Sequence, residues 1–348
     1  VDGNYTVNRF TKLFANQAGG STIAIGGPNT LTIDVNSSSG IPAGIENLAG
    51  ASNAGANGTL LEFNGNVNIA NSGSARTGIT INNNDANIVR FGTGSTLTLN
   101  SQLVMNDSSG RVELNGTVLG SANMNIWSDN VYFGSGHDSS GYGGNFIFAG
   151  TSKLTVDGGT VGQADKNLQV NSGNCELEFN ADNAINDLNV NVLVNGALTI
   201  AVKASQDDMG WLQVGNNPVT IDTVGGTLAF DDSSGRSWGT AAVVITNFTS
   251  GAIRFGVDDS GLTALQLQQI TAEGETGGAL LDADGYLYFE GEPPLITGEI
   301  VVDYDTAGGN TNSRPADIQS DTGYTWNVSE SEPLFVNSGQ NRTIYGGV

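Results

Sequence analysis

The chain has 348 residues, with 12 lysines and arginines against 35 aspartates and glutamates, so its formal net charge is −23. This charge excludes the usual nucleic-acid-binding proteins, because a phosphate backbone is held by clustered cations. The 50 glycines and the charged share of only 14% are unlike a helix-rich enzyme and indicate a chain with many turns. We expect no nucleic-acid partner and no membrane span, since no apolar run approaches the ~18 residues that a span requires.

Residues 1–58 form the least regular part of the first half of the chain. The runs STIAI and TLTIDV predict strands, and a stretch rich in Gly, Ala and Asn follows. We interpret 1–58 as an N-terminal cap or arm. Its first strand-like run contains Tyr5, Val7 and Phe10, and we expect this run to pair with the sheet edge of a neighbouring molecule by strand addition.

Residues 59–291 are predicted to form a β-solenoid. Short alternating segments start near residues 78, 87, 95, 102 and 111 and are separated by Gly, Asn, Asp and Ser. Every third segment returns after 24 residues, since 102 − 78 and 111 − 87 both equal 24. A return of this length is typical of a solenoid.

An antiparallel sandwich is the alternative, because its strands also follow one another every ~8 to 12 residues. The Asn-Gly pairs at 64–65, 115–116 and 195–196 would suit its two-residue hairpin turns. The 24-residue return and the linkers of varied length favour a parallel solenoid instead. Each coil of a solenoid buries its inward side chains only against its neighbours, so both ends of the stack need caps.

The single cysteine of the chain is predicted to be buried, and the single histidine is predicted to be exposed. Cys175 alternates with acidic residues in the run CELEF, which predicts a small core residue. His137 lies among glycines and serines, and a serine-histidine-aspartate triad would have to use it. Asp138 and Ser139 are its neighbours in the sequence, but this alone does not place them as the acid and the nucleophile of a triad. We therefore predict a solvated histidine in an exposed loop.

Three aromatic residues around this loop are candidates for binding a glycan. Met124 and Ile126 are expected to point inward, which places Trp127 outside, and Tyr132 is expected to point outward from the next strand. Tyr142 lies in the Gly-rich loop that follows. An exposed aromatic ring stacks on the CH face of a sugar while nearby amides bind its hydroxyls. The alternative is that the loop, or another subunit, covers these rings.

Paired aspartates could serve a polysaccharide hydrolase, which needs two carboxyls at a defined separation. They occur at 207–208, 231–232 and 258–259. The Gly-His-Gly and Arg-x-Lys elements in which β-helix pectin hydrolases resemble one another are absent, and four lysines offer few partners for an acidic polysaccharide. We therefore expect a protein that is not an enzyme, with a hydrolase or lyase as the alternative.

The motif Asp282-Ala283-Asp284-Gly285 is similar to the first half of a calcium loop. The position of the final bidentate glutamate is occupied by Pro293, so a tight turn is the preferred interpretation. We expect no cofactor and no defined metal ligands. Calcium bridging at another acidic junction is an open alternative, because the chain is strongly negative.

A short capping helix is predicted near the end of the solenoid, at Leu262–Ile270. Ser260 is its candidate N-cap, and Leu262, Leu265 and Ile270 would form its apolar side. Residues 292–348 then change character, with two adjacent prolines, a strand-like run and many acids. We predict a β-rich C-terminal extension that docks on a neighbouring subunit. Its candidate strand-addition residues are Ile296, Val301 and Tyr304.

A family resemblance is carried by motifs between residues 226 and 289. They are LAFDDSS (228–234), WG (238–239), ITNFTSG (245–251), IRFG (253–256), GLT (261–263), QLQQI (266–270) and LDADGYL (281–287). This stretch resembles the C-terminal module of bacterial surface proteins built from autotransporter-associated β-strand repeats. The resemblance implies an exported, right-handed parallel β-helix at or beyond the cell surface, and it implies no chemistry.

These observations together predict an all-β chain that works outside the cell. The acidity, the low lysine content and the start at a residue other than methionine lead us to expect a secreted or cell-surface protein. We expect a structural subunit that assembles with copies of itself into a homo-oligomer, a filament or a coat. The alternative is a glycan-binding adhesin or receptor-binding module.

Overall fold

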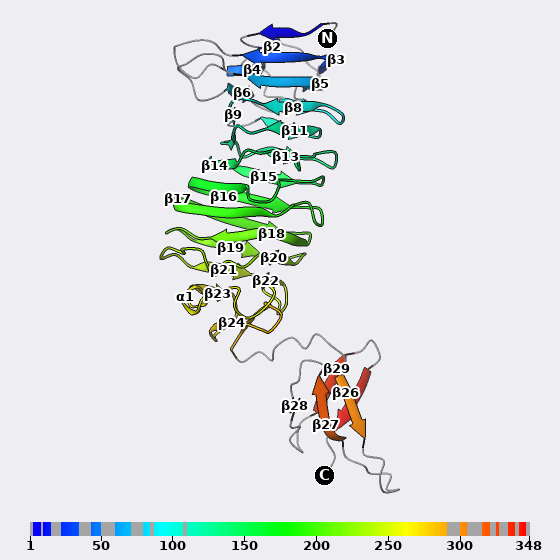
Figure 1. Ribbon diagram of the computed structural model, residues 1–348, viewed down its shortest axis with the longest axis vertical. Helices are drawn as coiled ribbons and strands as arrows, with labels where there is room; N and C mark the ends of the chain where they lie inside the picture. Colours follow the sequence, from blue (N-terminus) through cyan, green and yellow to red (C-terminus); the bar gives the residue numbers. More distant parts are fainter. Residues whose placement is uncertain are drawn as a thin grey trace. The chain divides into compact units, whose positions relative to one another are not determined.

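The computed structural model describes the backbone of residues 3–7, 10–14, 22–34, 43–49, 60–70, 79–83, 87–106 and 110–290, and of five strands after residue 299. The chain forms two compact units, Val1–Glu292 and Pro293–Val348. The first unit is a β-solenoid of about 9 turns, in which strands of successive coils pair in parallel (Figure 1). The predicted solenoid is therefore confirmed, and the antiparallel sandwich is wrong.

The strands of the solenoid lie on three faces, here called A, B and C; after β11 (Thr117–Gly120), face A continues only through isolated bridges among the described residues. Face A contains β1 (Tyr5–Val7), the second halves of β3 (Thr22–Asp34) and β5 (Leu60–Ala70), β8 (Thr96–Leu99) and β11 (Thr117–Gly120). Face B contains the first halves of β3 and β5, β7 (Ile88–Phe91), β10 (Arg111–Leu114), β13 (Val131–Phe133), β15 (Lys153–Val156), the second halves of β16 (Asn167–Phe179) and β17 (Leu188–Val202), β19 (Val219–Asp222), β21 (Val243–Thr246) and β23 (Ile270–Ala272).

Face C completes each coil. It contains β2 (Phe10–Phe14), β4 (Ala43–Ala49), β6 (Ile79–Asn83), β9 (Leu103–Met105), β12 (Met124–Ile126), β14 (Phe146–Gly150), the first halves of β16 and β17, β18 (Gln206–Gln213), β20 (Leu228–Phe230) and β22 (Ile253–Phe255). Parallel pairing already begins with β1 and β2, which pair with β3 and β4. The segment 1–58, predicted as a cap or arm, thus contributes strands to the same sheet.

The core of the first unit consists of columns of apolar side chains that run from coil to coil. On face B the register aligns ten of them without a break: Leu61, Val89, Val112, Val131, Leu154, Leu177, Ile200, Ile221, Ile245 and Ala272. All ten are buried. Successive members lie 19 to 28 residues apart along the chain, which agrees with the return expected from the sequence.

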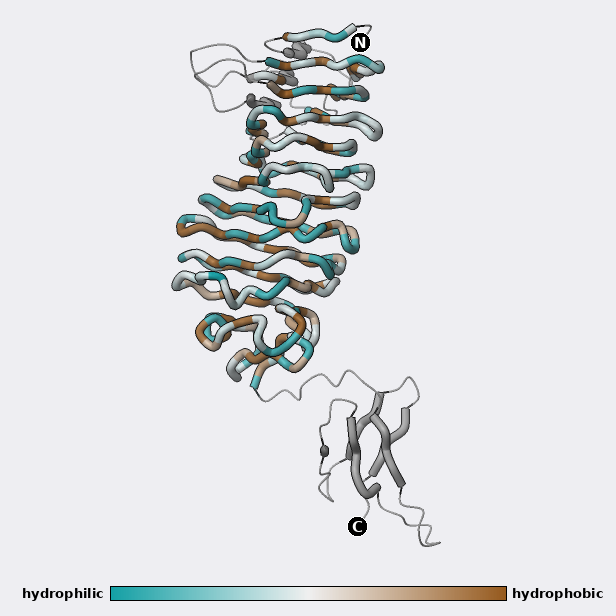
Figure 2. The backbone as a smooth tube through the Cα atoms, in the orientation of Figure 1, coloured by the Kyte–Doolittle hydropathy of each residue, from teal (hydrophilic) through white to brown (hydrophobic). Residues whose placement is uncertain are grey.

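The alternation of apolar and polar residues places these side chains inside. In many strands buried apolar residues alternate with more exposed polar ones, and Figure 2 shows hydrophobic and hydrophilic residues alternating along the coils. Cys175 belongs to the inner set and is buried, as predicted. Ser152 donates a hydrogen bond to its Sγ at 3.2 Å, and burial raises the pKa of the thiol.

None of the Asn-Gly pairs lies in a hairpin: 64–65 and 195–196 lie within β5 and β17 where each strand passes from one face to the next, and 115–116 lies between β10 and β11. At these corners an asparagine in one coil lies against a glycine in the next. A Cβ atom added at Gly134 would lie 1.9 Å from Oδ1 of Asn115, and one added at Gly92 would lie 2.0 Å from Oδ1 of Asn64. The glycines therefore make room for asparagine side chains of the coil before.

An asparagine ladder recurs where each of four successive coils enters face C, and three of its four members accept a backbone N–H of the next coil, since Oδ1 of Asn167 has no partner. Asn123, Asn145, Asn167 and Asn189 recur at intervals of 22 residues. Oδ1 of Asn123 accepts the backbone N–H of Asn145 at 3.2 Å, and Oδ1 of Asn145 accepts the backbone N–H of Asn167 at 3.0 Å. Oδ1 of Asn189 accepts the N–H of Trp211, a further 22 residues on. The ladder thus satisfies backbone donors at a corner where strand pairing is interrupted.

The C-terminal end of the coil stack is covered by a short helix and a hairpin. Helix α1 (Ala264–Leu267) has Thr263 as its N-cap, in a capping box with Gln266. The predicted N-cap Ser260 is wrong, because its side chain bonds to Asp258 in the preceding turn. Leu265 is exposed rather than part of an apolar side, because the helix is only four residues long.

The hairpin consists of β24 (Ala279–Leu281) and β25 (Leu287–Phe289). Oδ1 of Asp282 accepts the N–H groups of Asp284 and Tyr286, which is the tight turn expected at this motif. Leu281, Leu287 and Phe289 are buried, as are Leu262 and Ile270 nearby. The last coil of the core is therefore closed.

The second unit contains antiparallel strands only, among those that the structure describes. One sheet has β26 (Ile300–Tyr304), β27 (Pro315–Ser320) and β28 (Thr325–Trp326). A separate pair has β29 (Pro333–Asn337) and β30 (Asn341–Tyr345). The C-terminal extension is thus rich in β-structure, as predicted.

Replacing Asn145 by alanine tests the asparagine ladder. The change removes the acceptor of the Asn167 N–H, so we expect the free energy of unfolding to fall by about 1–2 kcal/mol. Urea denaturation followed by circular dichroism measures it. Asn100→Ala is the control, because Asn100 bonds to Asn68 in an exposed pair and should cost less than about 0.5 kcal/mol. Equal effects of the two changes would contradict the ladder's role.

Candidate functional site

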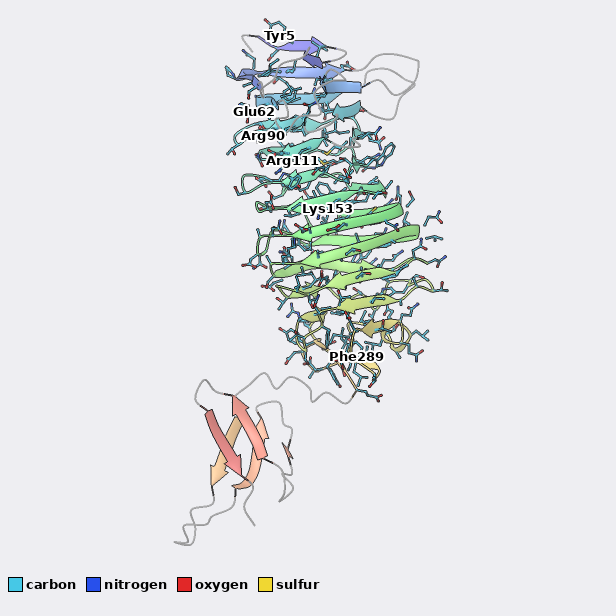
Figure 3. All side chains as sticks on the ribbon, turned by 180° about the vertical axis from the view of Figure 1, so that it is seen from behind. Tyr5, Glu62, Arg90, Arg111, Lys153 and Phe289 are labelled. Atoms are coloured by element: carbon cyan, nitrogen blue, oxygen red, sulfur yellow. The ribbon has the colours of Figure 1, made fainter. Side chains whose placement is uncertain are left out.

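The outward side of face B carries a row of paired charges. Residues of β5, β7 and β10 stand in register, which places Glu62, Arg90 and Glu113 next to one another. Arg90 contacts Glu62 at 3.5 Å and Glu113 at 2.5 Å. Figure 3 shows Glu62, Arg90, Arg111 and Lys153 following one another down the coils. The row therefore pairs charges across coils in a chain that is otherwise strongly acidic.

Glu113 connects this row to a candidate aromatic residue. Nε of Arg111 lies 2.6 Å from the second carboxylate oxygen of Glu113, and the guanidinium carbon of Arg111 lies 3.6 Å from the centre of the Tyr132 ring. This is a cation–π contact, worth ~0.5–1 kcal/mol at a partly exposed site. Tyr132 does point outward, as predicted, but Arg111 covers one of its faces.

A second cluster of charges follows on β15, β16 and β17. Nζ of Lys153 lies 2.7 Å from Glu176 and 2.8 Å from Glu178, and Lys203 lies 3.0 Å from Glu178. Burial alone would raise the pKa of the Glu178 carboxyl, yet the hydrogen bonds from both lysines bring it down to about 2. A carboxyl held ionised in this way is unsuited to donate a proton.

Trp127 is exposed at the corner between β12 and β13, as predicted. Its side chain is 38% exposed, while its backbone N–H donates to Met105 of the coil before. Met124 and Ile126 point inward and are fully buried. Of the three aromatic candidates for glycan binding, Trp127 has the most accessible ring.

Tyr142 is not available to a ligand, and its prediction as a glycan contact is wrong. The side chain is fully buried, its hydroxyl donates to the carbonyl of Ala122 at 2.5 Å, and its ring packs against Phe146. Burial raises the pKa of the hydroxyl. The Gly-rich loop supplies the inner side of a coil here, because Gly120 and Tyr142 form a parallel bridge.

His137 is also buried, which corrects the prediction of a solvated histidine. Its ring stacks on Phe133 with centroids 4.1 Å apart, and Nε2 lies 2.9 Å from Oγ of Ser139. That hydroxyl donates to the carbonyl of Thr160 and accepts the N–H of Gly162. Oγ of Ser139 is thus engaged with the imidazole, a backbone carbonyl and a backbone N–H at once.

The side chains of this loop alternate between buried and exposed positions, and the sequence analysis did not recognise this strand-like alternation. His137 and Ser139 point inward while Asp138 and Ser140 point outward, as in a strand. Asp138 forms parallel bridges to Thr117 and to Thr160 in the coils on either side. The loop therefore takes the place of a face A strand, and Ser139 cannot act as an exposed nucleophile.

The acid pairs are partly brought together. Asp208 and Asp231 lie close to Asp187, and burial followed by these two neighbours raises the pKa of the Asp187 carboxyl. Asp258 and Asp259 are exposed in a turn before α1. Within the residues that the structure describes, no group of three or more His, Cys, Asp or Glu side chains is arranged to hold a metal ion.

The candidates for strand addition are described only in part. Tyr5 is 47% exposed and Val7 is partly buried, both on β1 at the N-terminal end of the stack. The side chains of Phe10, Val301 and Tyr304, and all of Ile296, lie outside the described residues.

Comparisons of the sequence with protein-family models and curated proteins, and of the structure with solved structures, found no match. None of the helices that the structure describes has the length and apolar character needed to cross a membrane.

The buried imidazole predicts a loss of stability in mild acid. The pKa of His137 is lowered by burial from 6.5 to about 3, so the folded state favours the neutral ring. Its contribution is complete above pH 6.5, the unfolded value, and is lost as the pH falls towards 3. By pH 5 we expect the free energy of unfolding to have fallen by about 2 kcal/mol.

Urea denaturation at pH 7, 6 and 5 measures this dependence, in a range where most carboxylates stay ionised. His137→Gln should remove the slope between pH 6.5 and 5 whatever its effect at pH 7. An unchanged slope in the variant would show that other groups cause the acid sensitivity.

Proposed function

We propose that this chain is a structural β-solenoid subunit that works outside the cell and assembles with copies of itself. The observation that carries the proposal is that its potentially reactive side chains are buried or paired with other residues of the solenoid. Ser139, Glu113 and Glu178 join successive coils, and His137 is buried against Phe133 and bonded to Ser139, so none of these four is left accessible as a nucleophile or proton donor. Because these groups are buried or paired, they favour a structural role over a catalytic one.

The extracellular location is supported by the acidity, the low lysine content and the resemblance to surface proteins with autotransporter-associated β-strand repeats. Self-assembly is supported by apolar side chains of the first coils that stand at inward positions and are nevertheless exposed. Tyr5 is 47% and Ile23 40% exposed, although they stand in register with the buried Leu31 and Leu61. An exposed core column gains stability when another molecule covers it.

Light scattering after size-exclusion chromatography, with negative-stain imaging, tests assembly. We expect particles larger than 35.8 kDa at micromolar concentrations, with and without calcium, because the coil contacts described above require no metal. A uniform 35.8 kDa monomer at every concentration and calcium level would contradict the proposal.

A glycan-binding module is the second candidate, and the exposure of Trp127 is the observation that favours it. Binding of polysaccharides measured by calorimetry or on a glycan array should fall at least tenfold in Trp127→Ala, because the stacking surface is lost. Leu119→Ala, another exposed apolar side chain, is the control. Binding that ignores the Trp127 change, or no binding at all, would remove this candidate.

A further inference from the structure

The outward side of face C carries an uncharged surface over five successive coils. Its first column is the asparagine ladder, which Trp211 continues in the fifth coil, since Asn189 accepts the N–H of Trp211. Its second column is set by the strand register and consists of Asn125, Ile147, Gln169, Asn191 and Gln213. These ten positions, here called the amide surface, hold eight amides, one isoleucine and one tryptophan.

The alternation of burial shows that the amide surface faces outward. Leu168, Val190 and Leu212 alternate with its residues along the strands and are buried in the core. Among the ten positions only Asn125 and Asn189 are buried, and the other eight are partly exposed. The strands β14, β16, β17 and β18, which carry most of the surface, follow one another along the solenoid (Figure 1). A ligand can therefore reach most of these side chains.

The asparagine ladder does not use the full hydrogen-bonding capacity of these amides. The carbonyl oxygens of Asn125, Asn167 and Asn191 are buried and have no hydrogen-bond partner among the described residues. A buried acceptor without a partner is costly, and rotation of the amide about its terminal bond exchanges the carbonyl with the NH2 group. These side chains can thus present a donor or an acceptor to a hydroxyl of a ligand.

The amide surface is neutral in a chain whose net charge is −23. Face B of the same coils, by contrast, carries charged pairs such as Lys153 with Glu178. None of the ten positions holds a lysine or an arginine, the residues that bind the carboxylate or sulfate groups of an acidic glycan. The hydroxyl groups of a neutral sugar both donate and accept hydrogen bonds, and so match amides that do the same.

A tryptophan lies at each end of the amide surface. Trp127 follows Asn125 by two residues, at the corner beside the first coil of the surface, and its side chain is 38% exposed. Trp211 lies in the last coil, where the guanidinium of Arg236 contacts its ring at 4.0 Å from the centre. Trp127 therefore offers a ring on which a sugar can stack beside the amides.

We infer that the amide surface binds a neutral polysaccharide that lies across several coils. This inference rests on the second candidate function, glycan binding, and gives it a surface and a ligand class. Equivalent side chains of neighbouring coils lie about 4.8 Å apart, so the five coils extend over ~19 Å. A polysaccharide that follows the coils meets amides at a regular spacing, whereas a single sugar contacts few of them. The affinity should therefore increase with chain length.

Affinity electrophoresis tests this inference, because a chain with a net charge of −23 enters native gels readily. The gels contain mixed-linkage β-glucan, galactomannan, xyloglucan or dextran as neutral polysaccharides, and alginate or polygalacturonate as acidic ones. The wild type should be retarded by at least one neutral polysaccharide and by neither acidic one. Calorimetry with fragments of the retarding polysaccharide should give an affinity that rises about tenfold from the disaccharide to the hexasaccharide.

The double change Asn191→Ala and Gln213→Ala should weaken this retardation about tenfold, because two amides of the second column are lost. The matched control is Thr199→Ala with Thr220→Ala, since these residues stand in register on the outward side of face B in the same coils. Oδ1 of Asn191 makes no hydrogen bond within the described part of the chain, so we expect the double variant to fold, which circular dichroism checks. Gln169→Ala replaces it if it misfolds.

The outcomes separate this inference from the proposed functions. Retardation that is unchanged in the double variant overturns the amide surface, and it leaves glycan binding standing where Trp127→Ala still abolishes it. Retardation by acidic polysaccharides alone, or an affinity that ignores chain length, overturns the ligand class. No retardation in any gel overturns both this inference and the glycan-binding candidate, while light scattering decides self-assembly separately.

Discussion

Coil-on-coil contact is the constraint on which this structure depends. A coil of some twenty residues has no core of its own, so its backbone groups and apolar side chains are satisfied only by the coils on either side. The unbroken face B column from Leu61 to Ala272 is the direct result, since each member packs on the equivalent residue one coil away. Stability therefore accumulates by layers, and an end without a neighbour is its weakest point.

The same constraint determines which contacts the polar side chains make. An asparagine, serine, histidine or glutamate that points at the next coil must find a partner there, because a buried polar group without one is costly. Ser139 meets Gly162 and Thr160, Asn145 meets Asn167, and Glu178 meets Lys153. Residue types that suggest catalysis in an isolated motif thus serve as cross-coil contacts. The prediction of a solvated His137 was wrong because its loop packs against the next coil.

Much of the fold could be predicted because the sequence repeats its strand segments at a regular interval. Alternation predicted the inward positions of Cys175, Met124 and Ile126, and the 24-residue return predicted the parallel stack. Burial within loops could not be predicted from local composition, since Tyr142 and Ser139 bond to residues 20 and 21 positions away, in other coils. The recurrence of asparagine every 22 residues was readable, but among many asparagines it became distinctive only with the register known.

The charge distribution limits how copies of such a rod can meet. Repulsion in physiological salt is screened beyond about 8 Å, so net charge matters chiefly where surfaces touch. The corners that carry Asp187, Asp208 and Asp231 would bring carboxylates against a neighbour placed alongside. On face B the charges are already paired within the chain, so they offer little attraction to another copy. Packing of two solenoids side by side is therefore electrostatically unfavourable at these corners and gains little on face B.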